Sequence, residues 1–171
     1  MKAIKNLLIV LSLIFAFSAA GFAQNLSLTS LGGENVSLQS QKGKVVVLAM
    51  GATWLPLTKS QAIVINRLAK KYAGRDVVIY FVATDSTSSK SKNFASNEDI
   101  QAFATRNKLT ASILRDSDGA ATLKKFKIDQ LPAFIVLDKD GKPAAEPYSG
   151  LTPDQENDLV IQISKKIDGI L

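Results

Sequence analysis

Two continuous apolar runs, with a helix-period segment between them, constrain the fold of this sequence most strongly. Residues 45–50 and residues 77–82 are wholly apolar apart from one tyrosine, as in central strands that are covered on both faces. The apolar residues between them recur at three- and four-residue intervals: Ala62, Ile65, Leu68, Ala69 and Tyr72. This spacing predicts a helix with one buried face. Strand, helix and strand in this order predict a right-handed βαβ unit.

The beginning of the chain has the pattern of a secretory signal. Two lysines within the first five residues precede an apolar run at 7–17, and small residues follow up to Ala23. The run is shorter than the ~20 residues that span a bilayer, which favours cleavage over a membrane anchor. We therefore expect a signal peptide at 1–23, a mature domain at 24–171, no membrane insertion after cleavage, and a periplasmic or secreted location.

The other elements follow from local patterns. We expect a β-hairpin at 25–43, a surface loop at 84–95, a helix starting at Ser96, a strand around Ile113, a short helix at 116–126, a strand from Ala133, a turn at 138–142, and a last helix whose capping box is Thr152–Gln155. Together these elements predict one α/β domain, in which a central mixed sheet has helices on both faces and an N-terminal hairpin.

The composition excludes several kinds of chemistry. The chain has no cysteine and no histidine, so it has no thiolate, no disulfide and no imidazole base or ligand. Asp116 and Asp118 resemble the start of a calcium loop, but the position of the final glutamate is Lys127, so we expect no metal and no cofactor. The net charge of +6 is spread along the chain without a dense basic stripe, so we expect no nucleic-acid partner.

The turn after the first apolar run reads Gly-Ala-Thr-Trp-Leu-Pro-Leu-Thr, residues 51–58. It resembles the active-site turn of the exported TlpA-type branch of the thioredoxin-like superfamily, a branch related to the AhpC/TSA redoxins. That turn reads Ala-Thr-Trp-Cys-Pro-Pro-Cys. A second segment, Leu131-Pro132 at the start of a strand, resembles the cis-proline segment of the same fold. The resemblance covers essentially the whole mature chain and implies a thioredoxin-like fold.

The chemical positions of this family are changed in the sequence. Leu55 stands where the nucleophilic cysteine belongs, and Thr58 where the resolving cysteine belongs. Ala49 stands where the family often places an acid or amide beneath the cysteines. We interpret Thr58 as a helix cap or first-turn residue, because no histidine exists to activate its hydroxyl. We therefore expect no catalytic residue in this turn.

The resemblance also implies a surface, because the residue before the cis-proline presents its backbone to an extended peptide in this fold. The residues that could line an apolar groove there are Trp54, Leu55, Pro56, Leu57, Leu131 and Pro132. One hypothesis is a redox-inactive module that binds a protein or peptide partner through this groove. In a second interpretation, the leucines turn inward and Trp54 only packs. The activity that the family implies, thiol–disulfide oxidoreductase or antioxidant, is the alternative function.

Overall fold

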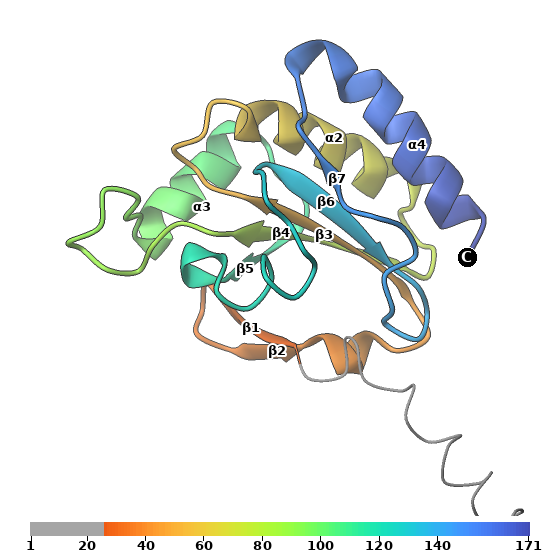
Figure 1. The fold of residues 1–171 in the computed structure, drawn as a ribbon, viewed down its shortest axis with the longest axis horizontal. Coiled ribbons are helices and arrows are strands. Elements are labelled where there is room, and N and C mark those ends of the chain that lie inside the picture. Colours follow the sequence, from red (N-terminus) through yellow and green to blue (C-terminus); the bar gives the residue numbers. More distant parts are fainter. Residues whose placement is uncertain (1–25) are drawn as a thin grey trace, which may run out of the picture.

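The computed structural model describes residues 26–171, and Figure 1 shows them as a mixed β-sheet with α-helices packed against it. The strands are β1 (Ser27–Ser30), β2 (Asn35–Ser37), β3 (Val45–Gly51), β4 (Val77–Ala83), β5 (Ser112–Arg115), β6 (Ala133–Leu137) and β7 (Tyr148–Ser149). The helices are α2 (Thr58–Lys71), α3 (Asn97–Arg106) and α4 (Glu156–Asp168), with short 3₁₀ helices η1 (Leu38–Gln41), η2 (Ser117–Gly119) and η3 (Pro153–Gln155). The predicted signal peptide lies outside the described residues.

Strand β3 lies in the interior of the seven-stranded sheet, whose order is β2-β1-β5-β4-β3-β6-β7. It pairs in parallel with β4 and antiparallel with β6, and all of its residues are buried. Strands β3 and β4 are joined by α2, so the predicted βαβ unit is confirmed. The predicted N-terminal hairpin is confirmed as well, since β1 and β2 pair antiparallel.

The three α-helices contribute to a single core on one face of the sheet. That core contains Val64, Ile65 and Leu68 of α2, Ile100 and Phe103 of α3, and Ile163 and Ile167 of α4. Figure 1 shows α2 and α4 together above β3 and β6. The expectation of helices on both faces was therefore wrong. The second face is covered by residues from the beginning of the domain and from the segment between β5 and β6, among them Leu26, Leu38, Phe126 and Ile128.

The segment between β5 and β6 does not form the predicted short helix. After η2 it continues as turns, because Asp118 and Gly119 have φ values of 57° and 66°, in the left-handed region that interrupts a helix. The carboxylate of Asp116 accepts hydrogen bonds from the N–H groups of Ala121 and Thr122, at 2.9 and 2.8 Å. Asp116 is buried and therefore stabilises a turn from within.

Two predicted helix starts had different outcomes. The Ser96 side chain accepts a hydrogen bond from the N–H of Asp99, and the Asp99 carboxylate accepts one from the N–H of Ser96, so α3 begins with a capping box. The capping box predicted at Thr152 is absent, because the Thr152 hydroxyl donates to the Asp154 carboxylate at 2.6 Å and α4 starts later. Within residues 26–171, no helix is both long and apolar enough to cross a bilayer.

Candidate functional site

The turn between β3 and α2 is held together by hydrogen bonds from its own residues. The carbonyl of Ala52 accepts one from the Leu55 N–H at 3.1 Å and one from the Thr58 hydroxyl at 2.7 Å. Thr58 is wholly buried and is the first residue of α2, and it makes no side-chain cap. Of the two positions expected for Thr58, the structure thus shows the first turn of the helix and not the cap. Its hydroxyl proton is committed to a backbone carbonyl, so it is not presented to a substrate.

One turn further along α2, the buried side chain of Gln61 ties three elements together, a role that sequence analysis missed. Its Nε2 donates to the carbonyls of Met50 in β3 and Ala133 in β6, both at 3.0 Å. Its Oε1 is buried without a hydrogen-bond partner among the described residues. A Cβ at Gly51 would lie 2.3 Å from this oxygen, so only glycine allows the close approach. The available signal was a glutamine on the apolar face of α2.

Ala49 lies in the middle of β3, immediately before Met50. It is wholly buried on the helix-covered face, and it pairs with Phe81 on one side and Phe134 on the other. Its methyl group cannot exchange a proton. The three positions that carry chemistry in the family are therefore occupied by an alanine, a leucine and a hydrogen-bonded threonine.

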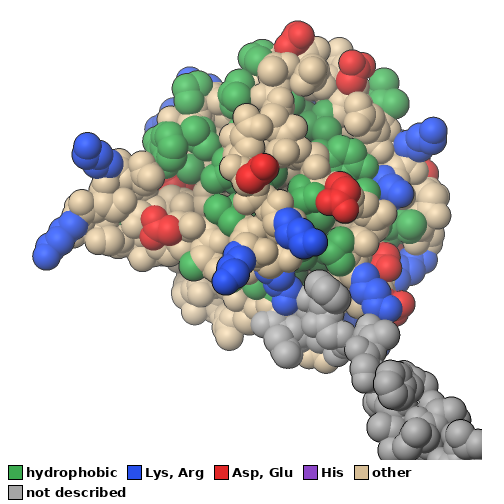
Figure 2. Space-filling model, viewed as in Figure 1, with side chains coloured by type: hydrophobic (Ala, Val, Ile, Leu, Met, Phe, Trp, Pro, Cys, Tyr) green, Lys and Arg blue, Asp and Glu red, His purple; other side chains and the backbone are tan. Residues whose placement is uncertain are grey.

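The outer side of the turn is apolar. Trp54 is 52% exposed and Pro56 is also exposed, whereas Leu55 and Leu57 are half-buried. Figure 2 shows hydrophobic side chains gathered over the region of this turn, at the upper left of the molecule. The leucines are thus neither fully exposed nor packed wholly into the core.

The Leu131–Pro132 segment lies at the same end of the sheet. Met50 pairs with Ala133, so the two residues before Ala133 lie beside the residues that follow Met50 and enter the turn. The Leu131–Pro132 peptide bond is cis, as predicted, with Pro132 buried and Leu131 half-buried. Among the described residues, the backbone N–H and C=O of Leu131 have no backbone or side-chain hydrogen-bond partner. The groove residues predicted from the sequence therefore come from two neighbouring segments.

The loop predicted at 84–95 is not wholly a surface loop, because Thr84, Asp85 and Ser86 are buried. The carboxylate of Asp85 accepts hydrogen bonds from the backbone N–H of Thr53, at 3.0 and 3.1 Å, and from its hydroxyl, at 2.7 Å. The sequence gives little sign of this contact, because the two residues are 32 positions apart.

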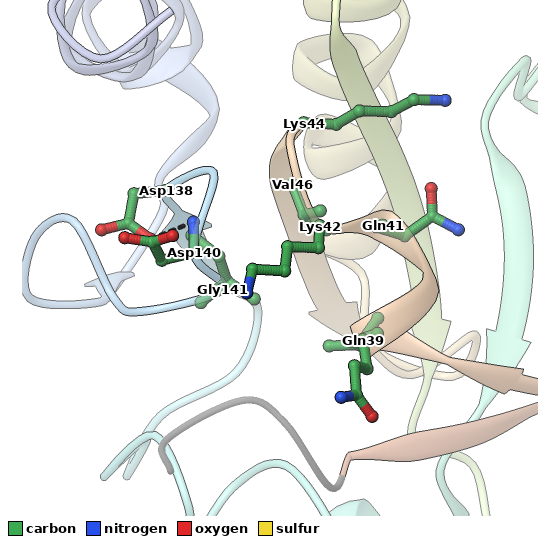
Figure 3. A pocket seen from close by; sticks show the side chains of 10 residues that line it. Gln39, Gln41, Lys42, Lys44, Val46, Asp138, Asp140 and Gly141 are labelled. Carbon is green, nitrogen blue, oxygen red and sulfur yellow. Dashed lines mark hydrogen bonds between the residues drawn. The ribbon is translucent and has the colours of Figure 1, made fainter. Parts of the chain in front are cut away.

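A small cavity lies at the opposite end of β3 (Figure 3). Leu38, Val46 and Leu137 form its apolar lining, and the side chain of Lys42 extends toward the turn that contains Gly141. Its volume of about 10 Å³ is room for about one water molecule. This cavity therefore offers no space for an organic ligand.

Among residues 26–171, the clearly shifted pKa values belong to groups outside the turn. Burial raises the pKa of Tyr80, and the hydrogen bonds from Ser96 lower the pKa of Asp99. The side-chain hydrogen bond from Lys71 lowers the pKa of Asp168. In the same residues, no group of three or more acidic side chains is arranged to hold a metal ion.

Comparison with known proteins agrees with this architecture. The model of the AhpC/TSA family matches residues 20–144. The thiol-disulfide oxidoreductase ResA of Bacillus thuringiensis subsp. konkukian is 28% identical over 142 residues, which cover 83% of this chain and 76% of ResA. The thioredoxin-like protein YneN of Bacillus subtilis is 34% identical over 119 residues, 70% of this chain and 65% of YneN.

A solved structure shows the same fold. The crystal structure of a secreted Mycobacterium tuberculosis disulfide oxidoreductase homologous to Escherichia coli DsbE superposes with a TM-score of 0.62 at 21% identity, covering 86% of this chain and 97% of that one. The predicted thioredoxin-like fold and family resemblance are confirmed. With a family match over most of its length and no cysteine at Leu55, at Thr58 or elsewhere, the chain is a cysteine-free member of the AhpC/TSA family.

Proposed function

We propose that this protein is a redox-inactive, exported thioredoxin-like domain that binds extended apolar segments of other proteins. The binding surface consists of Trp54, Leu55, Pro56, Leu57 and Leu131, and the buried Pro132 fixes the cis peptide bond that follows Leu131. The observation that carries the proposal is the exposed apolar side of the β3–α2 turn, next to an unpaired backbone at Leu131. An extended segment can pair with that backbone while its apolar side chains cover Trp54 and Pro56.

The lack of redox activity is inferred from the reaction that the family name implies. Thiol–disulfide exchange proceeds by attack of a thiolate on a disulfide and passes through a mixed disulfide. Neither leucine nor threonine can form that bond, and the chain has no cysteine elsewhere that could supply a thiolate. The names of ResA and of the secreted structural relative favour the alternative, an oxidoreductase or antioxidant role.

The export part of the proposal is supported by the signal-like pattern at 1–23. The structural relative described as secreted is consistent with it. In an oxidising compartment, a domain without cysteines cannot be trapped by stray disulfides.

Insulin reduction by dithiothreitol separates the two functions. We expect insulin reduction in the presence of this protein to proceed at the uncatalysed background rate, whereas an active thioredoxin, assayed in parallel, accelerates it. The double variant Leu55→Cys, Thr58→Cys should gain turnover, because the scaffold around the turn is intact. Turnover by the unmodified protein would contradict the proposal.

Binding is tested with a permanently unfolded polypeptide, fluorescein-labelled carboxymethylated α-lactalbumin, by fluorescence anisotropy. The wild-type protein should bind it saturably, and Trp54→Ala should weaken binding about tenfold, because exposed aromatic anchors dominate such surfaces. Ile161→Ala is a matched control, since Ile161 is 65% exposed on α4. An equal loss in both variants would indicate nonspecific adsorption.

A further inference from the structure

The carboxylate of Asp85 reaches the candidate surface from a different strand. Asp85 follows β4 and is wholly buried, yet both of its oxygens lie within 3.1 Å of the Thr53 backbone nitrogen. One oxygen also lies 2.7 Å from the Thr53 hydroxyl. Both hydrogen-bond donors of Thr53 are therefore held by one side chain. Thr53 immediately precedes Trp54, so this contact holds the residue from which the exposed apolar side of the turn begins.

The loop that carries Asp85 is itself held by Arg115, at the end of β5. The guanidinium donates to the carbonyls of Ala95, Asp85 and Ser86, at 2.9, 3.3 and 3.4 Å. It also donates to the side-chain oxygen of Asn97 at 2.7 Å. One cation therefore closes both ends of the 85–95 loop onto the sheet and places a positive charge next to the peptide of Asp85.

This arrangement differs from an ordinary ion pair. Both ion pairs found within residues 26–171 are made by Asp168, so neither Asp85 nor Arg115 takes part in one. A buried carboxylate is costly unless hydrogen bonds compensate for its lost hydration. Here the hydrogen bonds from Thr53 supply the compensation. Hydrogen bonds to a charged group are roughly twice as strong as neutral ones. The carboxylate is thus directed at the turn, and Arg115 contacts the backbone carbonyl of Asp85 and not its carboxylate.

We propose that Asp85 is the positioning residue of the binding surface: it fixes Thr53 and thereby orients Trp54 and Pro56 toward a bound segment. Arg115 supports it by fixing the loop from which the carboxylate projects. This inference rests on the proposed function for the identity of the surface. The positioning itself is a property of the free protein and is measured without a partner.

The variant Asp85→Asn tests the contact with little change in shape. The amide keeps one acceptor oxygen and loses the charge, and its NH₂ group cannot accept from the Thr53 N–H. The matched control is Asp118→Asn. This substitution also removes a charge next to the loop. The Asp118 carboxylate accepts hydrogen bonds from the hydroxyls of Ser86 and Ser117, at 3.1 and 2.9 Å, and makes no bond to the turn.

Two measurements on the free protein decide the proposal. Amide hydrogen exchange at Thr53, followed by NMR, should accelerate at least tenfold in Asp85→Asn and stay within twofold of wild type in Asp118→Asn. Trp54 is the only tryptophan in the chain, so time-resolved fluorescence anisotropy reports its local motion without ambiguity. That motion should increase in Asp85→Asn alone. Unchanged exchange at Thr53 and unchanged Trp54 motion in Asp85→Asn would overturn the proposal.

If Asp85→Asn fails to fold, Thr53→Val removes only the hydroxyl contact. It should increase Trp54 motion in the same direction by a smaller amount, and no increase would overturn the proposal. Binding of the carboxymethylated α-lactalbumin probe distinguishes the two claims. In a folded Asp85→Asn, affinity should fall at least threefold while Asp118→Asn binds like wild type, and wild-type affinity in Asp85→Asn would overturn the orienting role. A wild-type protein that binds no probe but shows the exchange and anisotropy changes would refute the proposed function and leave the positioning intact.

Discussion

The inner and outer sides of the β3–α2 junction have opposite characters. On the inner side, Thr58 and Gln61 are wholly buried and donate hydrogen bonds to carbonyls of β3, of β6 and of the turn itself. On the outer side, Trp54 and Pro56 are exposed and apolar. The inner bonds specify the shape of the junction, and none of them requires sulfur. The family's reactive groups can therefore be absent while the framework that presented them is complete.

The largest expected effect comes from the inner side. In Gln61→Glu, a carboxylate would face the carbonyls of Met50 and Ala133, where Nε2 now donates to both. We expect a loss of about 3–5 kcal/mol in the free energy of unfolding at pH 7, typical of an uncompensated buried charge. Urea denaturation measures it. The matched control is Gln101→Glu on the exposed side of α3, which should stay within about 0.5 kcal/mol of wild type.

The same variant should show a diagnostic pH dependence. Burial raises the pKa of a carboxyl group in the folded state, above the unfolded value of about 4.3 for glutamate. The penalty should therefore shrink as the pH falls toward that unfolded value and grow as the pH rises through the folded pKa. A penalty independent of pH would mean that packing, and not charge, is disturbed.

A smaller effect is expected for Thr58→Val, which keeps the shape and removes the hydroxyl donor to Ala52. We expect a loss of about 1 kcal/mol, because the Ala52 carbonyl still accepts from the Leu55 N–H. Thermal and urea unfolding measure it. The control is Thr105→Val, since the exposed Thr105 hydroxyl makes a similar bond to the Gln101 carbonyl at 2.9 Å on α3. Equal losses in both variants would show that the buried hydrogen bond of Thr58 stabilises the protein no more than the exposed one of Thr105.

On the outer side, Trp54→Ala should change the free energy of unfolding by no more than about 0.5 kcal/mol, because half of the side chain is already exposed. Leu68→Ala, which truncates a wholly buried residue of α2, should cost about 2–5 kcal/mol in the same experiment. A Trp54 variant as unstable as the Leu68 variant would assign Trp54 to the core and support the interpretation that it only packs.

The smallest effect concerns how the two helices begin. Helix α2 has Leu57 at its N-cap position and no side-chain cap, whereas α3 starts with the reciprocal bonds of Ser96 and Asp99. The backbone and hydroxyl bonds from Ser96 lower the pKa of Asp99 below 3.8, so their stabilisation is present above that pH and is lost as the pH falls through the lowered pKa. Asp99→Asn should slightly reduce the dependence of stability on pH below 4. An unchanged acid profile would show that this cap contributes nothing.

The fold could be predicted largely from apolar patterns. The runs at 45–50 and 77–82 fixed the central strands, and the spacing on α2 fixed its buried face, because burial on both sides of a sheet requires such runs. The helix predicted at 116–126 failed because backbone conformation at Asp118 and Gly119 overrides an ordinary helical pattern. Local propensity does not reveal which glycine or aspartate adopts the left-handed region.

The polar part of the site was the hardest to predict. Gln61 contacts a carbonyl 72 residues away and Asp85 contacts Thr53 across 32 residues. Long-range hydrogen bonds of this kind leave no periodic trace in the sequence. Asp85 also begins a stretch rich in serine and lysine, which is typical of a surface loop. The apolar positions from Trp54 to Leu57 could be located through the family resemblance, but their exposure could not.

The central claim, binding through the outer side of the turn without redox chemistry, is tested most directly by Leu55→Asp. Leu55 is half-buried, so the variant should lose only about 1 kcal/mol of stability in a melting experiment. Its affinity for the carboxymethylated α-lactalbumin probe should fall about tenfold, because binding would bury the exposed part of the leucine, worth roughly 1 kcal/mol, and would desolvate a charge in the variant. A variant that remains folded and binds the probe as tightly as wild type would contradict the account.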